Sequence, residues 1–308
     1  MTTDDALPTG YTGGMLEPTV HVPVLMDEVL QWLRPASGMT IVDGTLGGGG
    51  HARALAERVA PDGRVLAMDL DPAATERAET TLAGMPVLLA NRSYTDLPET
   101  LAELDIAAVD GILLDLGLSS DQLADDARGF SYHGVGELDL RFDPTQGEPA
   151  WRLLERMSET AIADAIYQFG EERFSRRIAR KIVERRRTGP PLRTAAELAD
   201  LVRSCVPRSA GHSIDPATRT FQALRILVNG ELEAVATALR TLPGCLNPGG
   251  RLAIISFHSL EDRLVKSAFR DDARLNVLTR RPIVPTEEEQ ARNPRSRSAK
   301  FRVAERVD

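Results

Sequence analysis

The sequence has little cysteine, histidine or aromatic character. It holds two cysteines, Cys205 and Cys245, and five histidines among 308 residues. The cysteines lie far apart and no Cys/His spacing matches a zinc site, so we expect neither a disulfide framework nor a bound metal. The chain also lacks a basic, apolar leader and any apolar run near the roughly 20 residues that cross a bilayer. These absences predict a cytoplasmic globular protein without a membrane span.

Positive charge is scarce over the whole chain but not everywhere. The net charge of -8 argues against a protein that coats nucleic acid nonspecifically. Residues 171–187 nevertheless carry eight basic and three acidic side chains, a local excess of five positive charges. Phe174, Ile178 and Ile182 recur every four residues and predict an inward face. The outward face then holds the side chains that we expect to pair with RNA phosphates, which are Arg173, Arg176, Arg177 and Arg180. A solvated helix with internal ion pairs is the alternative.

Short apolar runs alternate with helical patterns in the first half of the chain. Residues 1–18 have no apolar period and predict a disordered tail. A helical pattern over 24–33 follows, and another covers 52–59. Strands are predicted at 39–42, 65–68, 87–90 and 111–114. This alternation predicts a parallel, Rossmann-like α/β sheet that binds ligands beyond the carboxyl ends of its strands.

The alternation stops after Leu123 and returns late. Residues 125–215 have almost no strand pattern, which predicts an inserted helical domain that recognises the substrate. A long helix over 217–239 and a strand over 251–256 then resume the α/β pattern, with an edge strand expected at 301–304. We therefore predict one discontinuous cofactor-binding domain, built from 19–124 and 216–308.

The most informative local pattern is a strand that runs into a glycine-rich turn. Asp43 ends the strand, and five glycines follow within seven positions before His51 opens a helix. Such glycines let the backbone approach a ligand closely, although a plain tight turn is the alternative. Asp69 ends the next strand, where a carboxylate accepts hydrogen bonds from ribose hydroxyls. The acidic residue ahead of the glycines is typical of sites for S-adenosylmethionine (SAM), whereas a relaxed dinucleotide pattern also fits.

A polar loop follows the fourth predicted strand. It begins at Asp115 and contains Ser119 and Gln122. Because this loop lies at the carboxyl edge of the sheet, we expect the methyl donor to meet its acceptor there. A helix cap by Ser119, with Asp115 as a turn residue, is the structural alternative.

Many ordered segments resemble the bacterial small-subunit ribosomal RNA (cytidine-N4) methyltransferases, and the similarity runs from His21 nearly to the end. The matching segments are 21–25, 43–51, 110–117, 128–131, 138–144, 170–174, 217–225 and 250–263. The resemblance implies a class I SAM-dependent fold and methyl transfer to the N4 of a cytidine in the decoding region of 16S rRNA. By this resemblance the SAM contacts fall on Gly49, Gly50, His51, Asp69, Tyr94, Asp115 and Gln122, with Asp43 as the acidic strand end.

Two positions depart from the family pattern. Tyr94 stands where many relatives have Phe, and either ring can stack on adenine. Asp121 stands where relatives usually have Pro, so the shape of the loop before Gln122 is left open.

Methylation of an amino nitrogen sets the expected catalytic groups. The cytosine amino lone pair is delocalised into the ring, so the enzyme must position the base and offer oxygen acceptors to the amino hydrogens. The chain lacks the D/N-P-P-Y/F motif of DNA amino-methyltransferases at this position. The candidates are Asp115, Ser119 and His258, with His258 as a proton relay, whereas His51 is expected to orient the cofactor loop.

Two other function classes stay open on the residues alone. The Gly run and Asp69 also permit a dinucleotide-dependent oxidoreductase, which the loop after the fourth strand does not support. A noncatalytic ribosome-assembly factor with a vestigial SAM fold is the other alternative, and the intact glycines argue against it. The oligomeric state is not encoded in any pattern, and a homodimer is one of the states left open.

Overall fold

The computed structural model describes residues 23–132, 134, 136–207 and 215–307. The predicted tail of residues 1–18 lies outside this part of the chain. Within the described ranges, no helix combines the length and apolar character that a membrane span requires.

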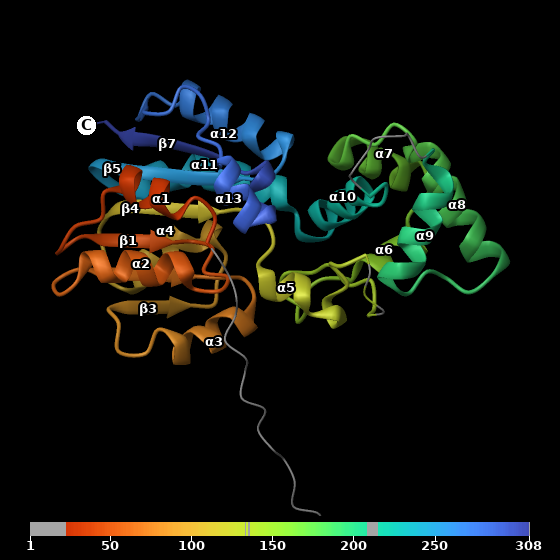
Figure 1. Cartoon of the computed structure of the whole chain (residues 1–308), viewed down its shortest axis with the longest axis horizontal. Helices are drawn as coiled ribbons and strands as arrows, with labels where there is room; N and C mark the ends of the chain where they lie inside the picture. The colour runs from red at the N-terminus through yellow and green to blue at the C-terminus, as the bar shows by residue number, and fades with distance from the viewer. Residues whose placement is uncertain (1–22, 133, 135, 208–214, 308) are drawn as a thin grey trace, which may run out of the picture.

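One seven-stranded sheet forms the centre of the larger lobe (Figure 1). The strand order is β3-β2-β1-β4-β5-β7-β6, in which the first five strands are parallel and β7 is antiparallel to both of its neighbours. The strands are β1 Thr40–Asp43, β2 Arg64–Met68, β3 Val87–Ala90, β4 Val109–Asp115, β5 Leu246–Ser256, β6 Leu275–Val277 and β7 Lys300–Arg306. The α/β sheet predicted from the sequence is confirmed.

The strand register places the functional strand ends at one edge. Asp43 at the end of β1 pairs with Ala67 of β2 and Leu113 of β4, and Asp115 pairs with Ile255 of β5. β1 lies between β2 and β4 in the interior, so its residues from Ile41 to Asp43 are buried on both faces of the sheet. The carboxyl ends of four neighbouring parallel strands therefore meet at one side of the sheet.

Helices cover both faces of this sheet (Figure 1). One face packs against α1 Met26–Leu33, α2 Gly50–Val59 and α3 Pro72–Thr81. The other packs against α4 Leu97–Glu103, α11 Glu231–Cys245 and α12 Ser259–Asp271. Val29 and Leu55 contribute to the first core, and Leu239 and Phe269 to the second. Such two-sided cover is what a parallel sheet requires.

A second, helical lobe lies beside the sheet (Figure 1). It contains α6 Ala150–Arg156, α7 Glu159–Gly170, α8 Ser175–Thr188, α9 Ala195–Cys205 and α10 Thr218–Asn229. Its own hydrophobic cluster runs from Phe130 to Val228 and includes Phe221 and Leu224 of α10. This core thus extends past residue 215, where the sequence pattern placed the end of the insert. The short α5 Ser120–Ala124 joins the lobes, and α13 Glu287–Arg292 precedes β7.

Two expected elements differ in the structure. The helix predicted over 217–239 is two helices, α10 and α11, separated at Gly230, whose φ of 61° lies in the left-handed region. The strand predicted at 301–304 is β7, but it lies between β5 and β6 and is not an edge strand. The sequence of β7 could not reveal this position, because its second neighbour, β6, comes from a separate segment of the chain.

Candidate active site

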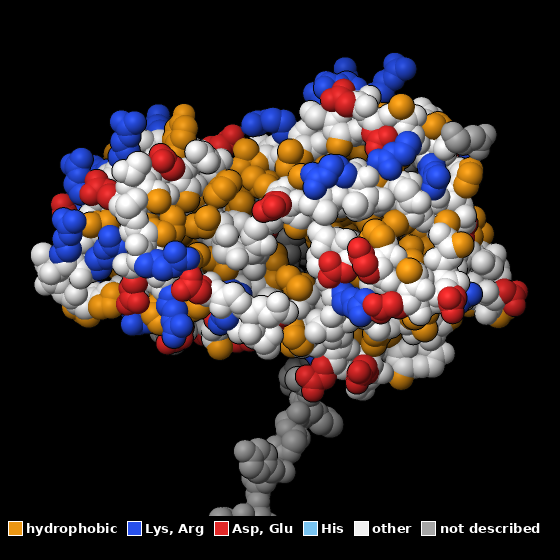
Figure 2. Space-filling view, turned by 180° about the vertical axis from the view of Figure 1, so that it is seen from behind, with side chains coloured by type: hydrophobic (Ala, Val, Ile, Leu, Met, Phe, Trp, Pro, Cys, Tyr) orange, Lys and Arg blue, Asp and Glu red, His pale blue; other side chains and the backbone are white. Residues whose placement is uncertain are grey.

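A cavity of about 720 Å³ opens at the carboxyl edge of the sheet. Its walls come from the β1–α2 turn, the ends of β2 and β4, the start of α11 and the segment that precedes β7. Tyr132 and Phe142 of the inserted region line it from the other lobe. The space-filling view shows the surface hollowed between the two lobes, with hydrophobic side chains along the hollow (Figure 2). A volume of this size lies within the roughly 300–1,000 Å³ of small-molecule sites.

Asp43 lies beneath the glycine turn and not on the cavity wall. Its carboxylate is fully buried and accepts a hydrogen bond from the Thr45 amide at 3.2 Å, while Oδ2 has no partner among the described residues. Burial, together with the charge of the neighbouring Asp69, raises the pKa of Asp43 to about 7. Gly47 and Gly49 have φ values of 50° and 78°, which lie in the left-handed region that favours glycine. This backbone conformation explains why the turn contains glycine at these positions.

Gly50 and Gly49 belong to the start of α2, and only Gly50 lines the cavity. A Cβ on Gly50 would lie 2.3 Å from Pro23 Cγ. Gly50 therefore lets Pro23, in the segment before α1, pack closely against α2, and it also lines the cavity.

Asp69 reaches the cavity from the end of β2. Its Oδ2 accepts a hydrogen bond from the Gly47 amide at 2.7 Å, and Oδ1 accepts one from the Asp71 amide at 2.8 Å. Burial raises the pKa of Asp69 to about 6, against the lowering effect of these two amides. Each carboxylate oxygen keeps a further lone pair, so the group can still accept ribose hydroxyls.

Asp115 and His51 lie next to each other on the cavity wall. The Asp115 amide donates to Thr45 Oγ1 at 2.6 Å, and its Oδ2 lies 3.7 Å from His51 Nδ1. Nε2 of His51 lies 3.1 Å from the Val24 carbonyl oxygen, which fixes the ring. Asp115 Oδ1 is buried without a hydrogen-bond partner in the described chain. Burial, with Asp43 and Glu261 nearby, raises the pKa of Asp115 well above its usual range.

The loop after β4 is held by a capping box. Ser119 Oγ accepts from the Gln122 amide, and Gln122 Oε1 accepts from the Ser119 amide, each at 3.1 Å. Gln122 Nε2 also donates to Asp71 Oδ2 at 3.0 Å. Arg295 donates to the carbonyl oxygen of Ser119 and to the hydroxyl of Ser120. Ser119 and Gln122 therefore both cap α5 and line the cavity, as does Tyr94.

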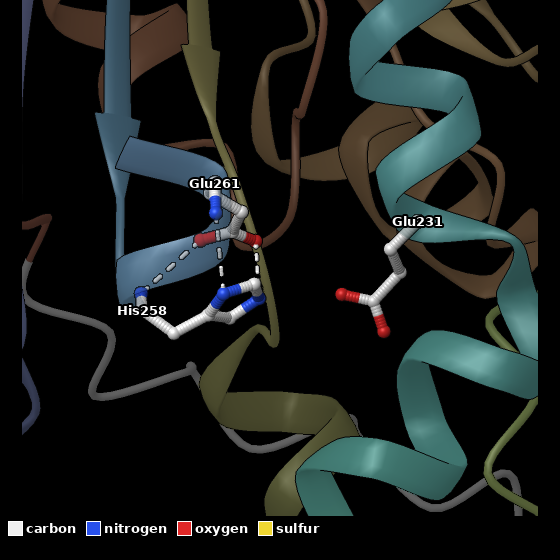
Figure 3. A group of neighbouring side chains, drawn as sticks. All are labelled: Glu231, His258 and Glu261. Carbon is white, nitrogen blue, oxygen red and sulfur yellow. Dashed lines mark hydrogen bonds and ion pairs between the residues drawn. The ribbon is translucent and has the colours of Figure 1, made fainter. Parts of the chain in front are cut away.

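His258 begins α12 and turns its ring toward Glu261 (Figure 3). Nδ1 accepts from the Glu261 amide at 3.3 Å, and Nε2 lies 3.1 Å from Glu261 Oε1. Glu231 approaches from α11, and one ligand atom of each of the three side chains lies within 4.8 Å of the others. Both Glu231 oxygens already accept from Arg225 at 2.8 Å, so a cation bound here would compete with a guanidinium. Glu231 and Glu261 line the cavity, whereas His258 does not.

The donor set suits SAM. The ligand is a cation, and Asp115 places a carboxyl group on the cavity wall, with the buried Asp43 beneath the glycine turn. Asp115 Oδ1, which has no partner among the described residues, can accept a hydrogen bond from a bound ligand. Asp69 suits the ribose, and the Tyr94 ring offers an aromatic face for the adenine.

Three of the four predicted RNA-binding side chains lie on α8, Arg173 lies just before the helix, and none of the four lines the cavity. Arg173, Arg176, Arg177 and Arg180 are exposed, whereas Ile178 and Ile182 are buried, which confirms the predicted two faces of the helix. Figure 2 shows Lys and Arg side chains on both lobes, with acidic side chains among them. Arg180 forms an ion pair with Glu159 at 3.8 Å, and this pair is exposed and therefore weak.

Several cavity residues were not singled out from the sequence. Arg225, Glu231 and Phe142 line it but lie in segments with ordinary helical or loop patterns. Arg225 ends one of the family-like segments, which is the single signal that pointed to it.

Comparison with known proteins adds independent information. The model of the MraW methylase family matches residues 18–307. "Ribosomal RNA small subunit methyltransferase H" of Rhodopirellula baltica is 53% identical, over 96% of this chain and 94% of that protein. The protein of the same name from Deinococcus radiodurans is 50% identical, over 93% and 90%.

Among solved structures, a putative rRNA methylase from Clostridium thermocellum aligns over 92% of this chain and 95% of its own, at 14% identity and a TM-score of 0.45. The family model and the two close relatives carry the assignment. They show that the chain belongs to the MraW methylase family.

Proposed function

We propose that the protein transfers the methyl group of SAM to the exocyclic N4 of a cytidine in the decoding region of 16S rRNA, within the small ribosomal subunit. The observation that carries the proposal is one acidic cavity that joins a SAM-type turn to the inserted lobe. The relatives' name, which specifies small-subunit ribosomal RNA, supports the substrate class. The N4 of cytidine follows from the family resemblance.

The cofactor half of the cavity is built from the ends of β1 and β2 and the turn after β4. Asp69 accepts the ribose hydroxyls, Tyr94 stacks on the adenine, and Asp115 lies beside the methionine portion. Gly49, Gly50 and His51 shape the turn, and Gln122 holds Asp71 beside Asp69. Bound SAM supplies a methyl group activated by its sulfonium centre.

The acceptor half needs a base that is splayed out of its stack. The Phe257 ring, after β5, offers a stacking surface, and Asp115 and Ser119 offer oxygens to the amino hydrogens. Asp115 Oδ1, which has no partner in the described chain, is the best placed acceptor of the departing proton.

The charge of the cavity favours this chemistry. Methyl transfer moves positive charge onto the acceptor nitrogen, and buried carboxyl groups stabilise that charge in a medium of low dielectric. A cation in the cavity also opposes the effect that raises the pKa of Asp115, and so favours its carboxylate form. For His258 we propose a positioning role, because its ring nitrogens face Glu261.

The arginines at the start of α8 are proposed to bind the RNA at positions that are distant from the reacting base. Arg173, Arg176, Arg177 and Arg180 would contact phosphates and carry no sequence preference. A small-subunit substrate agrees with the cytoplasmic location expected from the sequence. The expectation of a homodimer gains no support from the single chain.

The decisive experiment is transfer of radiolabelled methyl from SAM to small subunits purified from a strain that lacks this gene. We expect label in N4-methylcytidine after nucleoside analysis. Asp69→Ala should abolish the label and weaken SAM binding by roughly 10- to 100-fold, because a charged hydrogen-bond acceptor is lost. Exposed Asp62→Ala is the matched control. No label from wild-type protein that binds SAM would refute the ribosomal substrate.

A further inference from the structure

The acceptor side of the cavity contains a buried ion pair that the cofactor does not require. Arg225 comes from α10 and Glu231 from the first turn of α11, on either side of the break at Gly230. Nε of Arg225 donates to Oε1 of Glu231 and Nη2 donates to Oε2, both at 2.8 Å. The two side chains are 13% and 6% exposed, and both line the cavity.

A buried pair of this kind is a poor source of stability. The cost of removing both charges from water can exceed their attraction, and apolar side chains of similar volume often serve a core as well. Burial opposes the charged form of Arg225, but Glu231 outweighs it, so the pKa of Arg225 is raised and the guanidinium keeps its charge. An arginine held in this way is suited to recognition.

The ion pair fixes the direction of the unused donors. Nε and Nη2 are taken by Glu231, and no described residue accepts a hydrogen bond from Nη1. A bidentate contact fixes the guanidinium plane as well as its position. The Nη1 hydrogens therefore remain available to a ligand. Because Glu231 already holds the guanidinium, binding would cost little further side-chain entropy.

Gly117, Phe257 and Nη1 of Arg225 lie close together on the cavity wall. Gly117, in the turn after β4, has a φ of 103°. A Cβ there would lie 3.6 Å from Phe257 Cδ2 and 3.9 Å from Arg225 Nη1. The glycine thus keeps this part of the wall free of a side chain beside an aromatic ring and a guanidinium edge. A planar base that stacks on Phe257 here could bring its edge to Nη1.

We propose that Arg225, held by Glu231, binds the acceptor edge of the target pyrimidine, which rests on the proposed function. Cytosine presents acceptors at N3 and O2 beside its amino group. Donors from Arg225 hold that edge and leave the amino nitrogen to the methyl donor and to Asp115. Glu231 is a positioning residue that acts through Arg225. The site would take a pyrimidine with an unprotonated N3.

The test compares Arg225→Lys with Arg219→Lys in methyl transfer to small subunits. Arg219 lies on the same helix but is exposed and outside the cavity lining, with a bond to the Glu171 carbonyl oxygen. Lysine keeps the positive charge but lacks the planar guanidinium group with its several donors. We expect Arg225→Lys to lower kcat/KM for subunits by roughly 10- to 100-fold, the effect of one lost charged hydrogen bond. The SAM dissociation constant, measured by titration calorimetry, should stay within about twofold of wild type.

Glu231→Gln and the double variant test the holding role. If Glu231 acts through Arg225, the loss in the double variant should be close to that of Arg225→Lys alone. Additive losses would overturn that role. An unchanged kcat/KM in Arg225→Lys, or a SAM affinity that falls in parallel, would overturn the assignment to the pyrimidine. Failure of wild-type protein to methylate subunits would instead refute the proposed function itself.

Discussion

Arg128 of the inserted region donates a hydrogen bond from Nη1 to Asp71 Oδ2 at 2.9 Å, across the junction between the two lobes. The same guanidinium donates from Nη2 to the carbonyl oxygens of Arg141 and Phe142. Asp71 in turn donates its amide to Asp69. One arginine therefore connects the proposed ribose carboxylate to Phe142, an aromatic residue on the acceptor side of the cavity.

Loss of this arginine should destabilise the protein. We expect Arg128→Met to lower the free energy of unfolding by about 3 kcal/mol, because Asp71 would remain as a buried charge without its cation. Urea denaturation measures the change. Arg156→Met is the matched control, since its pair with Glu148 is 63% and 43% exposed and is worth at most about 1 kcal/mol. Equal effects of the two substitutions would contradict a structural role for the Asp71 contact.

Asp43 should make stability depend on pH. Its pKa in the folded protein is raised from 3.8 to about 7, so between these values the folded state keeps a proton that the unfolded state has lost. This contribution to stability is complete below pH 3.8 and is lost as the pH rises through 7. Asp43→Asn should therefore gain stability relative to wild type as the pH goes from 5 to 8, measured by thermal unfolding. A difference that does not change over this range would show that Asp43 is ionised throughout.

His258 gives a test that separates capping from proton transfer. Asparagine is a good N-cap but does not titrate, so His258→Asn should keep kcat within about threefold of wild type. His258→Ala loses the cap and should lower stability by about 1 kcal/mol. Both variants are compared by single-turnover methyl transfer and thermal unfolding. A loss of a hundredfold or more in kcat for a stable His258→Asn protein would instead establish the proton relay predicted from the sequence.

The arginine face of α8 should act on RNA affinity and not on SAM. Replacement of Arg173, Arg176, Arg177 and Arg180 by Gln should raise KM for subunits and reduce the dependence of log KM on log salt by up to about 3. SAM affinity should be unchanged. Arg58→Gln with Arg64→Gln, two exposed arginines on the sheet lobe, is the control. A salt dependence equal to wild type would favour the solvated-helix alternative.

Local patterns were sufficient for much of the cofactor side. Strand β3 begins and ends where its apolar run predicted, and the glycine turn has the left-handed φ values that only its composition suggested. These features are encoded within a few residues, because strand burial and turn geometry depend on near neighbours. Asp69, Tyr94 and Asp115 also line one cavity, since parallel strands bring their carboxyl ends together.

His258 shows where local reading was insufficient. Its loop follows a strand at the correct edge, which made it a candidate for chemistry. The direction of its ring depends on Glu261, three residues later, which is buried and accepts the amides of Phe257 and His258. A capping box is visible in sequence as a pattern, but histidine is an unusual first residue for one.

The sequence by itself determined the five parallel strands, the glycine turn and the charged face of α8, because each depends on residues that are close in the chain. Only the tertiary structure decided the acceptor side. Arg128 and Asp71 lie 57 positions apart, and the cavity wall at Gly117 is completed by a ring from after β5 and a guanidinium from α10. No local preference specifies such pairs. They meet because the helical insert packs against the edge at which the parallel strands end, and this packing converts a general cofactor fold into a candidate site for one base.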